Sequence, residues 1–112
     1  MSYKEIDVEE LNKIVDSGNC KNFIDVREPD EFYEVRAKGT KNMPLSVFDP
    51  DAFESNTGIP KNEPIYVICK MGGRSARACE LLADVGYTDL TNIAGGTTAW
   101  VGSSLPHESG DV

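Results

Sequence analysis

One junction constrains the fold more than any other part of the chain. An apolar run at residues 65–68 ends at Cys69, and a glycine-bearing loop then leads into a helical pattern. Such a run is typical of a central strand that is covered on both faces. The helix is indicated by apolar residues at i, i+3, i+4 and i+7 spacing: Ala78, Leu81, Leu82 and Val85. The junction therefore predicts an open α/β sheet with Cys69 at its carboxyl edge, where such sheets bind ligands.

The rest of the chain repeats this alternation of strand and helix. Besides residues 65–69, we expect short strands at residues 4–6, 22–26, 41–45 and 88–93. We expect helices at residues 7–15, 29–33, 49–55 and 97–101. This order implies an α/β fold with a central, mostly parallel sheet of about five strands, flanked by helices and joined by right-handed crossovers.

Composition indicates one domain over residues 1–112, with a core at about residues 3–106 and a frayed tail at residues 107–112. A formal net charge of −8 argues against nucleic acid or an anionic membrane as the main partner. No apolar segment reaches transmembrane length, and no signal-peptide core follows Met1. The three cysteines show neither a CxxC pair nor zinc spacing, so we expect a reducing cytoplasm and no metal or other cofactor.

The loop after Cys69 has the composition of an anion cradle. Gly72 and Gly73 allow a tight loop whose N–H groups point at one atom. Three cations, Lys70, Arg74 and Arg77, lie in a stretch without any Asp or Glu between Glu63 and Glu80. A helix N-terminus and nearby cations favour thiolate over thiol. We therefore expect Cys69 to be a reactive thiolate; the alternative is an inert, buried core cysteine.

The single histidine limits what this thiolate can do. His107 lies 38 residues beyond Cys69, in the expected tail, so loop N–H groups and cations rather than a base would activate the sulfur. Sulfur transfer fits, because its leaving group departs as an anion. Peptide hydrolysis fits poorly, because an amine leaving group needs a proton donor. We expect Cys79 to be a small core or boundary residue and Cys20 to lie in a turn, and a resolving role for either stays open.

Four segments in order carry a resemblance to a known family. They are Ile24-Asp25-Val26-Arg27-Glu28, Asn42-Met43-Pro44-Leu45, Cys69-Lys70-Met71-Gly72-Gly73-Arg74-Ser75 and Asn92-Ile93-Ala94-Gly95-Gly96-Thr97-Thr98-Ala99-Trp100. The chain resembles the single-domain rhodaneses, which are sulfurtransferases, over residues 3–106.

The resemblance implies a thiosulfate sulfurtransferase of the rhodanese type. Cys69 would carry a persulfide, and a substrate-binding cradle would comprise Lys70, Met71, Gly72, Gly73, Arg74 and Ser75. The sulfur donor would be thiosulfate or a persulfide, and the acceptor cyanide, a thiol or a thioredoxin-like protein. Asp25, Arg27 and Trp100 would be structural.

One position departs from the family pattern: Arg36 stands where many relatives have histidine. We expect Arg36 and Lys38 to lie on a solvated face; the alternative is that both extend a positive rim around the cradle.

Three rival functions remain. Cdc25-like phosphatases share the fold, but their wider loop has the form C-x5-R, whereas Cys69 and Arg74 here define C-x4-R. No nearby acid is expected to protonate a phosphate-ester leaving group. Arsenate reduction is disfavoured in the same way. A non-catalytic interaction module is the third rival, although such modules often lack the cysteine.

Overall fold

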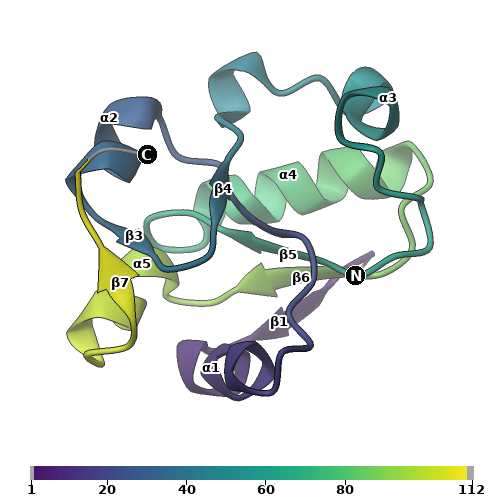
Figure 1. The fold of residues 1–112 in the computed structure, drawn as a ribbon. Helices are drawn as coiled ribbons and strands as arrows, with labels where there is room; N and C mark the ends of the chain where they lie inside the picture. Colours follow the sequence, from purple (N-terminus) through teal and green to yellow (C-terminus); the bar gives the residue numbers. More distant parts are fainter. Residues whose placement is uncertain (1, 111–112) are drawn as a thin grey trace.

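The computed structural model describes residues 2–110, which form the expected α/β fold with helices on both faces of one sheet (Figure 1). The five strands of the sheet are β1 (Lys4–Ile6), β6 (Leu90–Ile93), β5 (Ile65–Ile68), β2 (Phe23–Asp25) and β4 (Lys41–Asn42), in that spatial order. Every pair of neighbours in the sheet is parallel. The prediction of a mostly parallel sheet of about five strands is confirmed.

Within residues 2–110, four helices and two 3-10 turns lie between these strands in the chain, and a fifth helix follows the last of them. They are α1 (Val8–Asp16), α2 (Pro29–Glu34), η1 (Leu45–Val47), η2 (Pro50–Ala52), α3 (Phe53–Thr57), α4 (Gly73–Asp84) and α5 (Gly96–Gly102). The predicted cap of α1 is present, because the Asp7 carboxylate accepts a hydrogen bond of 2.9 Å from the Glu10 N–H. The strand expected at residues 41–45 is shorter than predicted, since Leu45 already begins η1 after Pro44.

The two faces of the sheet bury separate apolar clusters. Helices α3 and α4 cover one face, where Phe53 and Leu82 pack on Val67 of β5. Helices α1 and α5 cover the other, where Leu11 and Trp100 pack around Ile68. The central strand β5 thus contributes to both clusters, which explains its nearly continuous apolar sequence.

The C-terminal segment differs from prediction. His107 and Glu108 form strand β7, which pairs antiparallel with β3 (Arg36–Ala37) instead of fraying. The expectation of a frayed tail is wrong for residues 107–110, and its last two residues lie outside the described part of the chain. Trp100 helps to hold the segment, because its indole N–H donates a 2.6 Å hydrogen bond to the Pro106 carbonyl.

Arg36 stabilises the same segment. Its side chain is 6% exposed, stacks over the Phe32 ring at 4.9 Å and donates 3.0 Å hydrogen bonds to the carbonyls of Phe32 and Gly110. Both expectations for Arg36, a solvated face and a positive rim, are therefore wrong. Lys38 is exposed.

Candidate active site

Cys69 lies directly between the end of β5 at Ile68 and the start of α4 at Gly73, as predicted. Cys69 is only 1% exposed. The loop that follows turns at Gly72, whose φ of +111° is a conformation that favours glycine. This turn points the Gly72 N–H at the sulfur, with 3.1 Å between N and Sγ.

The surroundings of Sγ favour its anionic form. The Ser75 hydroxyl oxygen, on the first turn of α4, lies 3.3 Å from Sγ. Burial raises the pKa of Cys69, but hydrogen bonds from the Ser75 hydroxyl and from the N–H groups of Ser75, Gly72 and Met71 outweigh it. The pKa of Cys69 is therefore lowered from its ordinary value of 9.0. Hydrogen-bond donors, first the Ser75 hydroxyl and then the backbone N–H groups, account for this effect.

The cations of the loop are less available than the sequence suggested. Arg74 donates two hydrogen bonds, of 2.7 and 2.9 Å, to the carboxylate of Glu31 on α2. Arg77 lies 3.6 Å from Glu80. Among residues 2–110, only Lys70 of the three makes no ion pair. The predicted positive island is thus partly neutralised, because an acid from a distant segment folds onto it.

The ion pair with Arg74 strongly lowers the pKa of Glu31. The hydrogen bonds from Arg74 lower the pKa of Glu31 from 4.5 to about 2, against the opposing effect of burial. The N–H of Glu28 contributes in the same direction, because it donates to the Glu31 carboxylate in the capping box of α2. Glu31 therefore joins α2 to the Cys69 loop at neutral pH.

The start of α5 supports the loop from the other side. The N–H and the hydroxyl of Thr97 donate to the carbonyl of Cys69 at 2.9 and 3.0 Å, and the N–H of Thr98 donates to the Lys70 carbonyl at 3.1 Å. A Cβ on Gly96 would lie 2.5 Å from both carbonyl oxygens. Only glycine allows this close approach.

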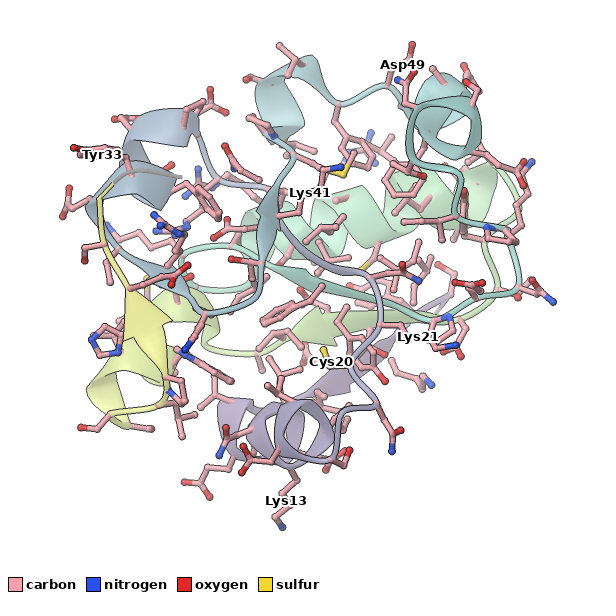
Figure 2. The ribbon with its side chains drawn as sticks, in the orientation of Figure 1. Lys13, Cys20, Lys21, Tyr33, Lys41 and Asp49 are labelled. Atoms are coloured by element: carbon pink, nitrogen blue, oxygen red, sulfur yellow. The ribbon has the colours of Figure 1, made fainter. Side chains whose placement is uncertain are left out.

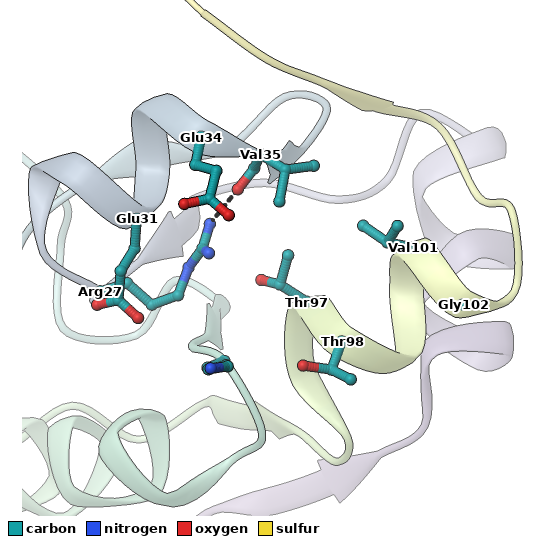
Figure 3. A pocket seen from close by; sticks show the side chains of 9 residues that line it. Arg27, Glu31, Glu34, Val35, Thr97, Thr98, Val101 and Gly102 are labelled. Carbon is teal, nitrogen blue, oxygen red and sulfur yellow. Dashed lines mark hydrogen bonds between the residues drawn. The ribbon is translucent and has the colours of Figure 1, made fainter.

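A second support comes from the buried end of β2. The Arg27 guanidinium bonds both carboxylate oxygens of Asp25 and donates a 2.6 Å hydrogen bond to the Val35 carbonyl (Figure 3). Asn42 donates to the carbonyls of Asp25 and Arg27. These contacts agree with the structural role that the family resemblance implies for Asp25 and Arg27.

A pocket of about 410 Å³ opens beside the loop, between α2 and α5 (Figure 3). It is lined by Arg27, Glu31, Glu34, Val35, Lys70, Thr97, Thr98, Val101 and Gly102. Lys70 directly follows Cys69, and Glu31 also binds Arg74 of the cradle. The pocket therefore borders the candidate site on two sides.

The predicted site residues separate into distinct positions around the sulfur. Gly72 and Ser75 contact Sγ directly, and the Met71 N–H contributes to the lowered pKa. Met71 is 69% exposed, and Gly73 begins α4. The structure thus places residues 69–72 in the loop and residues 73–75 in the first turn of α4, where Arg74 is directed to Glu31.

Sequence reasoning missed Asn92, the residue that hydrogen-bonds the Ser75 hydroxyl. Asn92, at the end of β6, accepts from the Ser75 hydroxyl and donates to the Gly72 carbonyl and to the Glu5 carboxylate. Asn92 is 1% exposed. An amide side chain within a short strand that begins at Leu90 and ends at Ile93 was the signal that could have identified it.

The other two thiols lie in different environments. Cys79 is fully buried on α4, and burial raises its pKa to about 12. Cys20 lies between α1 and the sheet (Figure 2), and burial raises its pKa to about 11. The core role predicted for Cys79 is confirmed, and both thiols are weaker acids than Cys69.

Comparison with known proteins agrees with this geometry. The chain is 32% identical to the putative sulfur carrier protein YrkF of Bacillus subtilis over 103 residues, which cover 92% of this chain and 54% of that one. It is 29% identical to a sulfurtransferase of Allochromatium vinosum, with 91% and 92% covered. The human single domain sulfurtransferase TSTD1 superposes with a TM-score of 0.72 at 26% identity, covering 88% of this chain and 95% of that one.

The chain spans about half of YrkF, so its own partners do not follow from that relative. A family model for the rhodanese-like domain matches residues 7–103. This match covers most of the chain, including the Cys69 loop and the β6 to α5 segment that supports it. The chain belongs to the rhodanese-like domain family.

Proposed function

We propose that this protein is a sulfurtransferase that moves a sulfane sulfur through a persulfide on Cys69. The observation that carries the proposal is the buried Sγ with donors at 3.1 and 3.3 Å and a pKa lowered by them. Such a sulfur is a nucleophile without any base beside it. The single histidine supports this view, because His107 is exposed on β7 and its Nδ1 bonds the Leu105 carbonyl.

Each half-reaction balances without a proton. With thiosulfate, the Cys69 thiolate attacks the outer sulfur, a new S–S bond forms, the donor's S–S bond breaks, and sulfite leaves with the electron pair. The persulfide then carries one negative charge on its outer sulfur. In the second half-reaction, cyanide or a thiolate attacks that sulfur, and Cys69 leaves as a thiolate. A cradle that stabilises this thiolate assists both steps.

The neighbouring pocket suits the part of the substrate that is not transferred. Its lining offers an ammonium from Lys70, a carboxylate from Glu34, and hydroxyl groups from Thr97 and Thr98. We expect the body of a donor or acceptor to occupy it while its sulfur approaches Cys69. The proposed donors are thiosulfate or a persulfide, and the proposed acceptors are cyanide, a small thiol or a thioredoxin-like protein.

Relatives with informative names support the class of reaction. One is a sulfurtransferase and another is a putative sulfur carrier.

We propose a cytoplasmic location for the activity. Within residues 2–110, none of the helices has the length and apolar character needed to cross a membrane.

Intact mass spectrometry after incubation with thiosulfate tests the proposal. We expect a gain of one sulfur atom in the wild type and in Cys79→Ala, and no gain in Cys69→Ser. Cys20→Ser is a further control, because Cys20 and Cys69 pack in different apolar clusters. A folded wild type that takes up no sulfur from thiosulfate or a persulfide would instead indicate a non-catalytic module.

A further inference from the structure

A buried chain of hydrogen bonds extends from Cys69 across two strands. Ser75 Oγ lies 3.3 Å from Cys69 Sγ and 2.5 Å from Asn92 Oδ1. Asn92 Nδ2 then donates to Glu5 Oε2 on β1 at 2.9 Å and to the Gly72 carbonyl at 3.2 Å. Ser75 is fully buried and Asn92 nearly so. The contact between Ser75 and Asn92 is therefore shielded from bulk water.

The orientation of the Asn92 amide follows from its partners. Both oxygens that face Nδ2, the Glu5 carboxylate and the Gly72 carbonyl, can only accept hydrogen bonds. The NH₂ group must therefore point at them, and Oδ1 must point at Ser75. An amide oxygen cannot donate, so the contact between Asn92 and Ser75 requires the hydrogen of the Ser75 hydroxyl.

Ser75 consequently has one hydrogen for two acceptors. When Sγ is a thiolate, it is the stronger acceptor, because charge-assisted hydrogen bonds are about twice as strong as neutral ones. When Sγ is uncharged, it accepts only weakly, and the amide oxygen of Asn92 is the better partner. Rotation about the Cβ–Oγ bond of Ser75 changes the acceptor without moving a heavy atom.

We propose that Asn92 is a positioning residue for Cys69: its side-chain oxygen holds the Ser75 hydroxyl hydrogen while Sγ is uncharged and releases it when Sγ becomes a thiolate. Asn92 acts through Ser75 and does not touch the sulfur. The buried hydroxyl thus keeps a partner in both charge states of Cys69, which avoids the cost of an unsatisfied donor.

The consequence of this change of hydrogen-bond acceptor for sulfur transfer rests on the proposed function. When Cys69 accepts sulfur, the negative charge moves to the outer sulfur and Sγ becomes uncharged, so the hydrogen returns to Asn92. When the acceptor removes that sulfur, Sγ regains the charge and the hydrogen turns back to it. No proton is transferred in either direction.

Several charged groups also surround the cradle and must be held constant in a test. They are Glu5 from β1, Asp25 and Arg27 from the end of β2, Glu31 from α2, and Lys70 and Arg74 from the loop. A double-mutant cycle on Ser75 and Asn92 keeps all of these residues, and the loss of the hydrogen bond from Asn92 to Glu5 occurs in both Asn92→Leu variants and so cancels. The cycle therefore isolates the coupling between the two polar side chains.

The experiment is the pH dependence of Cys69 alkylation in the wild type, Ser75→Ala, Asn92→Leu and the double variant. Ser75→Ala should decrease the thiolate fraction at a fixed pH by about two- to tenfold, which is the range for one hydrogen bond. In the Asn92→Leu background the same change should decrease it by a larger factor, because the hydroxyl hydrogen then has no competing acceptor. Thr91→Val is the matched control for a polar-to-apolar change within β6, and we expect it to leave the alkylation midpoint unchanged.

An equal or smaller effect of Ser75→Ala in the Asn92→Leu background would overturn the proposal, because Asn92 would then only hold Ser75 in place. If circular dichroism shows that Asn92→Leu does not fold, Asn92→Ala completes the same cycle. Alkylation needs no sulfur transfer. A protein that shows the coupling but takes up no sulfur would contradict the proposed function and keep the role of Asn92.

Discussion

The carboxylate of Glu31 binds the guanidinium of Arg74 through two hydrogen bonds of 2.7 and 2.9 Å, across 43 positions of the chain. This contact joins α2 to the first turn of α4, beside the sulfur of Cys69. Arg74 therefore contributes to the loop mainly through its pair with Glu31, and less as a free cation than its position in the sequence suggested.

The pair predicts a specific acid sensitivity. The pKa of Glu31 is about 2 in the folded protein and 4.5 as its ordinary value, so the pair stabilises the fold above pH 4.5 and loses this effect as the pH falls toward 2. The side chains of Arg74 and Glu31 are 36% and 29% exposed, which limits the contribution of the pair to the free energy of unfolding to about 0.2–1 kcal/mol. Urea denaturation across this window should show a steeper loss of stability in the wild type than in Glu31→Gln.

Glu9→Gln is the control for that measurement, because Glu9 is an exposed carboxylate on α1. It should preserve the wild-type slope. Identical slopes for the wild type and Glu31→Gln would show that the pair with Arg74 contributes nothing to the acid response.

The three thiols should react in a defined order. The pKa of Cys69 is below 9.0, whereas the pKa of Cys20 is raised to about 11 and that of Cys79 to about 12. Since the thiolate is the nucleophile, iodoacetamide in mildly alkaline buffer should modify Cys69 first. Peptide mapping at partial modification measures the order. A Cys69 midpoint at or above 9.0, or equal labelling of Cys20, would mean that the cradle does not stabilise the anion.

Gly96 predicts a steric coupling between α5 and the Cys69 loop. Gly96→Ala would place a Cβ 2.5 Å from the carbonyl oxygens of Cys69 and Lys70, at a φ of +55°. We expect the free energy of unfolding to fall by about 1–3 kcal/mol from backbone strain alone, and sulfur uptake to fall with the displaced loop. Gly102→Ala is the matched control for stability, because no heavy atom lies within 4 Å of its Cβ position.

An unchanged rate of sulfur uptake in Gly96→Ala, measured by intact mass over time, would show that the loop tolerates displacement. Unchanged stability would contradict the close approach itself.

Loop length should decide between sulfur and phosphorus chemistry. In the native loop, the Gly72 N–H and the Ser75 hydroxyl both contact Sγ, and the Gly72 carbonyl accepts a hydrogen bond from Asn92. One glycine inserted between Gly72 and Gly73 would move Gly72 relative to Ser75, so that these contacts could not all form together. We expect sulfur transfer to fall roughly 100-fold, as for other misplaced reactive groups, while binding of phosphate-like oxyanions improves. A single glycine inserted after Gly18, in the exposed turn that follows α1, is the control. Hydrolysis of an aryl phosphate by the unmodified protein, lost in Cys69→Ser, would contradict this account.

The sequence predicts the parts of the site that are local in the chain. The strand before Cys69, the Gly72 turn and the start of α4 follow from apolar runs, glycine positions and helix spacing within a short segment. The contacts of Arg74 with Glu31 and of Ser75 with Asn92 join distant segments, and no local pattern specifies them. Only the assembled sheet places the ends of β5 and β6 side by side.

The pairing of β3 with β7 is the clearest failure of sequence reasoning. Each strand has two residues, too few for the alternation that identifies a strand. The segment is held by tertiary contacts instead, through Arg36 on the carbonyls of Phe32 and Gly110 and through Trp100 on Pro106. The polar composition that suggested fraying carries no information about those partners.

A single-turnover transfer from the loaded protein tests the central claim most directly. The protein is incubated with thiosulfate, freed of small molecules and then mixed with cyanide, and both thiocyanate and the protein mass are measured. The account predicts one thiocyanate per loaded protein and a return of the mass to that of the unmodified chain, with neither signal in Cys69→Ser. Loaded protein that yields no thiocyanate, or thiocyanate formed equally by Cys69→Ser, would contradict it.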